Sequence, residues 1–182
     1  EIPLRLVGSE MCIRDSFPNG WKANLLGVDL NLQYPAGWLQ AREIKFSQGY
    51  TRPGPRDYVG KAPLTQRESR ALADFTNYLD PALILAYHTQ GEQIYWKYDD
   101  IDVPGALALG QEFARLSGYS LEETPYASGF AGYKDWFIKV WRRPGFTIEA
   151  GLGENPLPIS QFDTIYAKNL GILTTAALGL PA

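Results

Sequence analysis

The stretch "ALILAYH" at residues 82–88 decides the fold class, because it is a short apolar run that ends in a polar side chain. Chain breakers bound it, with Asp80 and Pro81 before it and the polar "TQGE" after it. A short, continuous apolar run between breakers is typical of a strand that is buried on both faces of a parallel sheet. The run predicts such a strand over 82–87, with His88 just beyond its carboxyl end.

A second run, "PGFTIEAG" at residues 144–151, predicts a second buried strand that delivers Glu149 at its end. The surrounding segments have helical spacing of apolar residues, and we expect helices from Thr65 onward and over 104–117, 134–142 and 160–178. Strands that alternate with helices predict an α/β fold with a mainly parallel (mixed) sheet and helices on both faces.

Two of the expected helices carry capping signals. In "TQRE", Thr65 and Glu68 have the spacing of a capping box, and Ser160 is a cap for the final helix. The apolar positions are Leu72, Phe75 and Leu79 in the first helix and Phe162, Ile165, Leu170 and Leu173 in the last. Residues 39–64 are rich in Pro, Gly and Arg without a clear period, so we expect a long functional loop there.

In α/β folds of this kind, ligands bind outside the carboxyl ends of the strands, and both His88 and Glu149 are expected there. An imidazole and a carboxylate at neighbouring strand ends suit metal-assisted hydrolysis, in which a carboxylate deprotonates the attacking water. The alternative is a structural histidine that one hydrogen bond satisfies. The periodicity of the two segments leaves both interpretations open.

The composition limits the classes of protein that are possible. A chain of 182 residues with 45% hydrophobic residues is long enough for one globular domain with a core. Its net charge of −3 disfavours nucleic acid and anionic membrane surfaces as partners. The sequence has no apolar run long enough to span a bilayer. The single cysteine, Cys12, excludes an internal disulfide and a Cys-based zinc cluster. We expect a soluble protein, with its compartment open between the cytoplasm and the cell envelope.

The first 16 residues do not fit the pattern of the rest. Residues 6–16, "LVGSEMCIRDS", resemble one translated frame of a transposase-type sequencing adapter. We therefore expect residues 1–16 to be non-native and exclude them from functional argument, as one would exclude a tag. The alternative is a genuine but irregular N-terminal strand. In the first case the natural protein begins upstream, and residues 17–182 are the C-terminal part of its catalytic domain.

Four stretches together carry a resemblance to a known family: "GVDLNLQYPAGW", "ILAYHTQGEQIYW", "YASGFAGYKDWF" and "RRPGFTIEAGLGENPLP". They resemble, in the same order, the zinc carboxypeptidase A family, and specifically its bacterial branch of γ-D-glutamyl-L-diamino acid endopeptidases. The resemblance covers residues 17–182. It implies a carboxypeptidase-like fold, a Zn²⁺ cofactor in the intact enzyme, and hydrolysis of amide bonds in peptidoglycan stem peptides or muropeptides.

The resemblance also implies roles for single residues. His88 matches the family's third zinc ligand, and Glu149 in "FTIEAG" matches the catalytic glutamate that activates water and protonates the leaving amine. Tyr126 resembles the mobile active-site tyrosine that closes over the substrate. The spacing from Tyr126 to Asp135 is one residue longer than in the family pattern, so Tyr133 is the alternative.

Substrate selection is where the sequence departs from the family. Asn31 matches an asparagine that helps to hold a substrate carboxylate, but Leu32 stands where classical carboxypeptidases have the arginine that anchors the C-terminal carboxylate. Loss of a bidentate guanidinium argues against simple carboxypeptidase specificity and favours the γ-D-Glu to diamino acid bond. The arginines that could bind the substrate carboxylates instead are Arg142, Arg143 and Arg52, although each could equally be a solvated surface charge.

The family's first two zinc ligands form a His-x-x-Glu pair, and no histidine precedes His88 in this chain. Catalytic zinc needs three protein ligands, so the 182-residue chain is expected to be inactive alone. A rival hypothesis is a non-catalytic relative that only binds muropeptides, against which the retention of Glu149 argues. A serine hydrolase is disfavoured, because "YASGFAG" lacks the first glycine of a nucleophile elbow around Ser128.

Overall fold

The computed structural model describes residues 20–178, so the expectations for residues 1–16 lie outside the described part. The α-helices are α2 (Trp38–Ser47), α3 (Arg67–Leu79), α4 (Ala106–Ser117), α5 (Tyr133–Trp141) and α6 (Phe162–Leu178). The strands are β1 (Ile84–His88), β2 (Gln93–Tyr95), β3 (Ser120–Glu122) and β4 (Gly145–Glu149). Short 3₁₀ helices are η1 (Leu30–Leu32), η2 (Tyr126–Ser128) and η3 (Ile159–Gln161).

The four strands form one sheet in the order β1-β4-β2-β3. β1 and β4 run parallel, with Ile84 opposite Gly145 at one end and His88 opposite Glu149 at the other. β2 is antiparallel to β4 and parallel to β3. The predicted α/β fold with a mainly parallel, mixed sheet is therefore confirmed, and the two long strands end at the same edge.

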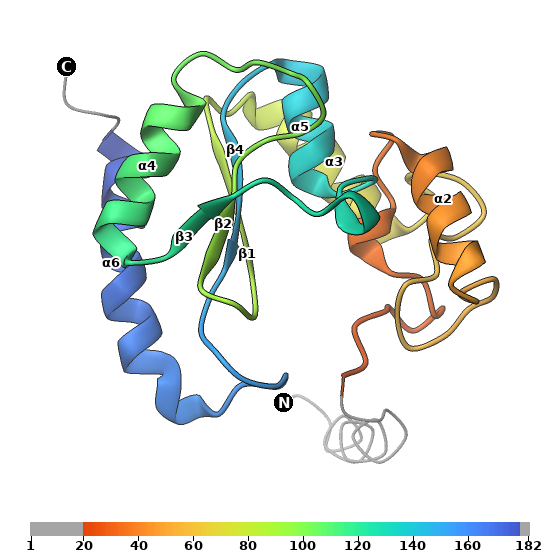
Figure 1. Ribbon diagram of the computed structural model, residues 1–182. Coiled ribbons are helices and arrows are strands. Elements are labelled where there is room, and N and C mark those ends of the chain that lie inside the picture. Colours follow the sequence, from red (N-terminus) through yellow and green to blue (C-terminus); the bar gives the residue numbers. More distant parts are fainter. Residues whose placement is uncertain (1–19, 179–182) are drawn as a thin grey trace, which may run out of the picture.

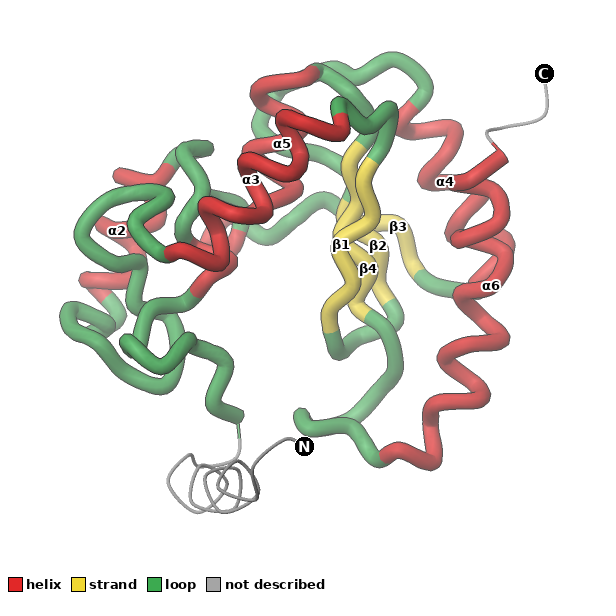
Figure 2. The backbone as a smooth tube through the Cα atoms, turned by 180° about the vertical axis from the view of Figure 1, so that it is seen from behind, coloured by secondary structure: helices red, strands yellow, loops and turns green. Residues whose placement is uncertain are grey.

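Helices cover both faces of this sheet, as predicted (Figures 1 and 2). α4 and α6 lie on one face, over a cluster that includes the fully buried Phe113, Phe146 and Ile148. The rings of Phe113 and Phe146 pack edge to face, with their centroids 5.0 Å apart. Each such buried side chain contributes roughly 1.5–3 kcal/mol through removal of apolar surface from water. α3 and α5 lie on the opposite face, where α5 contacts β1 and β4.

The two long strands and helix α4 were predicted well from their sequence patterns. β1 covers the predicted run from Ile84 and includes His88 as its last residue, and β4 delivers Glu149 at its end. α4 begins at Ala106 and ends at Ser117, close to the expected 104–117. Gly118 ends α4 in a left-handed conformation with φ of 75°, which glycine adopts without a steric penalty.

The expected loop over 39–64 is wrong in its first third, because Trp38–Ser47 form helix α2. Only Trp38 and Ala41 of this helix are buried, against Leu32 and Val59. The rest of its sequence is polar or exposed, so it lacks the regular apolar stripe that marks an amphipathic helix.

The predicted capping box at Thr65 is also wrong. α3 begins at Arg67, and the Thr65 hydroxyl bonds to the side-chain oxygen of Gln33 and the carbonyl of Ala62 instead. The stripe of Leu72, Phe75 and Leu79, which we expected to face the core, is substantially exposed and lines a groove of about 480 Å³ beside β1. The small side chains Ser69, Ala73 and Thr76 face inward, because η1 and α5 approach α3 closely there.

The final helix begins later than expected. Ser160 lies in η3 rather than at a helix cap, and α6 starts at Phe162. Ile165 packs against the core, but the other three predicted apolar positions are exposed, and Ile172 is the fully buried one. The three-residue strands β2 and β3 were not predicted at all. Within the described residues, each helix is too short or too polar to pass through a membrane.

Candidate active site

His88 and Glu149 meet at the carboxyl ends of the two central parallel strands. They are register partners in the β1–β4 pair, and the next backbone hydrogen bond, from Ala150 N–H to the His88 carbonyl, measures 2.9 Å. Register partners on parallel strands project their side chains to the same face. Both line one cleft, as predicted from the two apolar runs.

Partial burial changes the protonation of both groups. Burial lowers the pKa of the His88 imidazole, the positive charge of Lys22 adds to this effect, and Asp29 opposes it. Burial raises the pKa of the Glu149 carboxyl, and Lys22 works in the opposite direction. Burial therefore favours the neutral form of the imidazole and makes the Glu149 carboxylate a stronger base than an exposed one.

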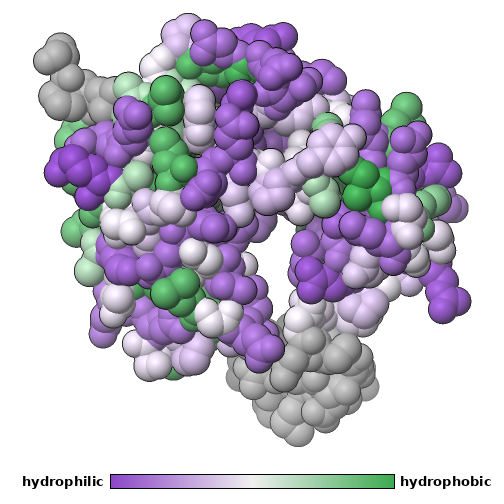
Figure 3. Space-filling model, viewed as in Figure 1, coloured by the Kyte–Doolittle hydropathy of each residue, from purple (hydrophilic) through white to green (hydrophobic). Residues whose placement is uncertain are grey.

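The cleft has a volume of about 1340 Å³ and lies between the sheet and the segment before η1. Figure 3 shows the molecule hollowed between these two parts, with hydrophilic side chains along the rim. The sheet side contributes His88, Thr147 and Glu149, and the opposite side contributes Lys22 and Asn31. A cleft of this size accommodates a peptide of several residues.

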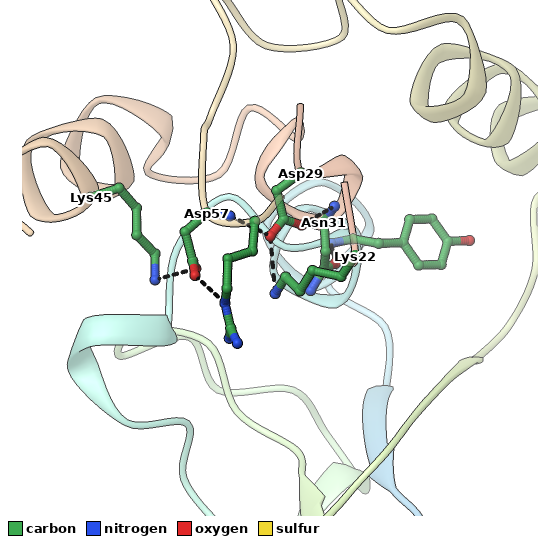
Figure 4. Close-up of polar contacts among 7 residues, drawn as sticks. Lys22, Asp29, Asn31, Lys45 and Asp57 are labelled. Carbon is green, nitrogen blue, oxygen red and sulfur yellow. Dashed lines mark hydrogen bonds and ion pairs between the residues drawn. The ribbon is translucent and has the colours of Figure 1, made fainter. Parts of the chain in front are cut away.

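Asn31 lies at the wall of this cleft, in η1 (Figure 4). Its side-chain oxygen accepts a hydrogen bond of 3.2 Å from the backbone N–H of Tyr133, which joins η1 to the start of α5. The neighbouring Leu32 is buried in a cluster with Trp38 and Val59 and does not line the cleft. Leu32, at the position of the family's arginine, therefore packs in the core and does not contact a ligand in the cleft.

Asp29 holds Asn31 in position and was not among the predicted site residues. Its carboxylate is buried and accepts hydrogen bonds from the backbone N–H groups of Asn31 and Asp57, at 3.3 and 3.1 Å. Lys22 completes its neutralisation with a 3.0 Å ion pair (Figure 4). The "GVDLN" stretch signals such a role, because an aspartate directly before a short helix commonly accepts a hydrogen bond from the backbone N–H two residues later.

The two candidate tyrosines lie differently from the expectation. Tyr126 is 73% exposed, packs edge-on against Phe130, and is not among the residues that line the cleft, although Ser128 in the same 3₁₀ turn is. The hydroxyl of Tyr133 is 2.8 Å from that of Thr76, and its ring contacts Tyr34. Tyr133 is therefore occupied in packing between α5 and α3.

The three arginines considered for carboxylate binding lie elsewhere. Arg143 bonds to the side chain and carbonyl of Asp80 and to the carbonyl of Pro81, at the end of α3. Arg142 ends α5 in a left-handed conformation, and Arg52 is exposed in the loop after α2. None of the three lines the cleft that contains His88 and Glu149.

Two further residues of the cleft join the segments that follow the strands. The Thr89 hydroxyl donates to the side-chain oxygen of Asn155 at 2.8 Å, and the Asn155 amide donates to the Thr89 carbonyl at 3.0 Å. This reciprocal pair ties the chain beyond His88 to the loop beyond Glu149. Thr89 and Asn155 are 66 positions apart, so no local sequence pattern indicated this contact.

The donors present do not complete a zinc site. His88 suits a metal, because its imidazole is kept neutral. Over residues 20–178, however, the structure contains no group of three or more His, Cys, Asp or Glu side chains placed to hold a metal ion.

The chain is similar to a known family and to several known proteins. A family model described as zinc carboxypeptidase matches residues 13–170. The γ-D-glutamyl-L-diamino acid endopeptidase 1 of Lysinibacillus sphaericus is 54% identical over 154 residues, which are 85% of this chain and 37% of that protein. The chain thus spans well under half the length of this curated relative.

Solved structures show the same fold. Bovine thrombin-activatable fibrinolysis inhibitor matches with a TM-score of 0.64 and 17% identity, over 89% of this chain and 60% of that one. The murein-tripeptide amidase MpaA from Escherichia coli O157 matches with a TM-score of 0.56 and 19% identity, over 83% of this chain and 59% of that one. From the family match over most of its length, the chain belongs to the zinc carboxypeptidase family.

Proposed function

We propose that the protein to which these residues belong hydrolyses amide bonds in peptidoglycan stem peptides, at the bond between γ-D-glutamate and a diamino acid. The observation that carries the proposal is that His88 and Glu149 are register partners at the ends of β1 and β4 and line the same cleft. The Lysinibacillus sphaericus relative, which is 54% identical, is named a γ-D-glutamyl-L-diamino acid endopeptidase, and this name supports the substrate class. A peptide or muropeptide is therefore the proposed partner.

Glu149 is the proposed general base and acid. Its carboxylate would take a proton from the attacking water and later deliver that proton to the leaving amine, so that the glutamate is unchanged after each turnover. A pKa raised by burial suits this role, because a carboxylate whose pKa lies above its ordinary value is a stronger base toward the attacking water. Its central strand and its backbone ladder hold the side chain in place.

Zinc is the proposed cofactor of the intact protein, because the matching family is described as zinc carboxypeptidase. His88 would be one ligand, and zinc would supply charge that polarises the scissile carbonyl. The chain has one histidine and one cysteine, so we propose that the other ligands lie outside it and that the 182-residue chain is inactive alone. In the same proposal, residues 17–182 are the C-terminal part of the catalytic domain and residues 1–16 are non-native.

Asn31 and Tyr126 are the proposed substrate-binding residues. The amide of Asn31 lies on the wall of the cleft and is fixed through its oxygen by Tyr133, which leaves its nitrogen to donate to a ligand. Tyr126 has an exposed ring on a short turn next to cleft residue Ser128, and an inward rotation of that turn would be required before it touched substrate.

A chimera tests the proposed function. Residues 20–178 would replace the matching part of the Lysinibacillus sphaericus relative, and hydrolysis of L-alanyl-γ-D-glutamyl-L-lysine would be followed by chromatography. We expect turnover, and we expect Glu149→Gln to lower kcat roughly 10²- to 10⁴-fold while binding of the peptide persists. The matched control is Glu43→Gln, since Glu43 is exposed on α2 and lies away from the cleft.

The same experiment separates the enzyme from the rival hypothesis of a non-catalytic muropeptide-binding relative. A folded chimera that binds the peptide without turnover would favour the binding protein. For the 182-residue chain itself we expect no tight, stoichiometric zinc and no hydrolysis. Stoichiometric zinc with turnover would overturn the proposed dependence on ligands from elsewhere.

A further inference from the structure

Two positively charged side chains on the cleft have no role in the function proposed above. Lys22 precedes η1 and Arg56 lies in the loop after α2, and both line the cleft together with His88 and Glu149. Their side chains are 47% and 54% exposed, so both charges remain accessible to a ligand.

Both cations are anchored on buried aspartates, Asp29 and Asp57, that are in contact through the backbone of Asp57. Lys22 pairs with Asp29 at 3.0 Å, and Arg56 donates through Nε to Asp57 at 2.7 Å. The backbone N–H of Asp57 donates to the carboxylate of Asp29 at 3.1 Å, so the two anchors are neighbours (Figure 4). This connection holds Lys22 and Arg56 at the same part of the cleft wall.

The charges of this cluster do not balance. Asp57 is already paired with Lys45 at 2.8 Å, and that lysine is only 12% exposed. Asp29 also accepts two backbone N–H groups. Within this ion-paired group three cations therefore face two carboxylates, and the two exposed cations, Lys22 and Arg56, are the ones that line the cleft. Glu68 also lines the cleft, but its carboxylate accepts a hydrogen bond from Asn24, and no ion pair joins it to Lys22 or Arg56.

Both cations also keep donors that their anchors do not use. Arg56 bonds to Asp57 through Nε, and no described residue accepts a hydrogen bond from its two terminal nitrogens. An ammonium has three N–H groups, of which the single Asp29 oxygen engages one on Lys22. Guanidinium and ammonium groups with free donors are the side chains that bind carboxylates most strongly.

The proposed substrate, a γ-linked glutamyl peptide, carries a free carboxylate that these two cations could bind. When glutamate is linked through its γ-carboxyl, its α-carboxylate stays free on the acyl side of the scissile amide, whereas an α-linked residue without an acidic side chain has no carboxylate there. We propose that Lys22 and Arg56 form the subsite that binds this free α-carboxylate. The inference rests on the proposed function and accounts for substrate recognition without an arginine at position 32, where Leu32 is buried in the core.

The test compares two peptides on the full 182-residue chain, by NMR titration at pH 7. The probes are L-alanyl-γ-D-glutamyl-L-lysine and the same peptide with the glutamate α-carboxylate converted to a carboxamide. We expect the acid to bind at least about tenfold more tightly than the amide, as a charge-assisted contact provides. Lys22→Met and Arg56→Met should each remove most of this preference and leave the affinity for the amide unchanged.

Two controls keep the result interpretable. Lys22→Met leaves Asp29 without its cation, so Lys22→Arg, which keeps the charge, should retain the preference for the acid. Lys139→Met, at an exposed position on α5 away from the cleft, should change neither affinity. Equal binding of both peptides by the unchanged chain would overturn the subsite alone. Failure of both peptides to bind would overturn the proposed substrate class and the subsite together.

Discussion

At the scale of single residues, the most unusual feature is a buried ion pair between consecutive residues. Lys134 and Asp135, in the first turn of α5, are each 4% exposed and 2.7 Å apart. Lys134 also donates to the carbonyl of Lys97 at 2.6 Å, and Asp135 accepts from the backbone N–H of Gly132 at 3.1 Å. The pair lines the cleft but is neutralised internally, so it holds the start of α5 in place rather than attracting a charged ligand.

Asp135→Asn should lower the free energy of unfolding by about 3–5 kcal/mol, because it leaves the ammonium of Lys134 buried without a counter-charge. Urea unfolding followed by circular dichroism measures this change. The double variant Lys134→Met with Asp135→Asn should regain part of the loss, since the uncompensated charge is gone. Asp74→Asn on the exposed side of α3 is the control and should stay within about 0.5 kcal/mol. A loss below about 1 kcal/mol in Asp135→Asn would contradict the argument.

At the scale of elements, Gln33 organises the connection from η1 to α3. Its fully buried amide donates to the carbonyls of Val59 and Ala62. Its oxygen accepts from the backbone N–H groups of Thr65 and Gln66 and from the Thr65 hydroxyl. One side chain thus replaces the backbone partners that this loop lacks, and it sets where α3 begins.

Gln33→Met should destabilise the protein by about 2–4 kcal/mol, because it keeps the volume of the side chain but leaves several buried backbone groups without partners. The matched control is Gln40→Met on the exposed side of α2, which should have almost no effect. Thermal and urea unfolding of both variants decide the question. Equal stability of the two variants would show that water replaces the amide of Gln33.

Gln33 also explains which elements the sequence could reveal. The strands that end in His88 and Glu149 depend on local apolar runs, which a single segment displays completely. The start of α3 was predicted wrongly because the Thr65 hydroxyl bonds to Gln33, 32 positions away, rather than to its own helix. Helix α2 was missed because Trp38 and Ala41 alone bury its face.

The residues of the candidate site could likewise be predicted from the sequence only in part. His88 and Glu149 could be placed together from the sequence, because parallel strands bring their carboxyl ends to one edge. Lys22 and Arg56 could not, since their position depends on the contact between Asp29 and Asp57, which are 28 positions apart. The exposed placement of Tyr126 likewise depends on its packing against Phe130, which the spacing of the motif does not determine.

At the scale of the whole molecule, the cluster around Asp57 joins three parts of the chain. The segment before η1 contributes Lys22 and Asp29, helix α2 contributes Lys45, and the loop before α3 contributes Arg56 and Asp57 (Figure 4). The first and third of these parts line the side of the cleft opposite the sheet through Lys22 and Arg56, and α2 supports them from behind through Lys45. The cluster therefore stabilises the shape of the cleft as well as the fold.

The pH dependence of stability should follow this cluster. Burial alone raises the pKa of Asp57, but hydrogen bonds from Lys45 and Arg56 and the charges of Lys45 and Lys22 outweigh it, so the pKa lies below its ordinary 3.8. A carboxyl with a lowered pKa in the folded state stabilises the protein above its unfolded value of 3.8. That contribution is lost as the pH falls through the lower folded value, where the folded protein also takes up the proton.

Asp57→Asn removes this contribution and provides the comparison. At pH 7 it should lower the free energy of unfolding by about 2–3 kcal/mol, as expected for buried hydrogen bonds to a charged group. Urea unfolding from pH 7 down to pH 3 should show the gap between the original chain and Asp57→Asn unchanged above about pH 5 and narrowing below pH 4. The titrations of His88 and Glu149 affect both proteins equally and cancel in the difference. A gap that stays constant to pH 3 would mean that the negative charge of Asp57 contributes nothing, and that its hydrogen bonds survive with a neutral side chain.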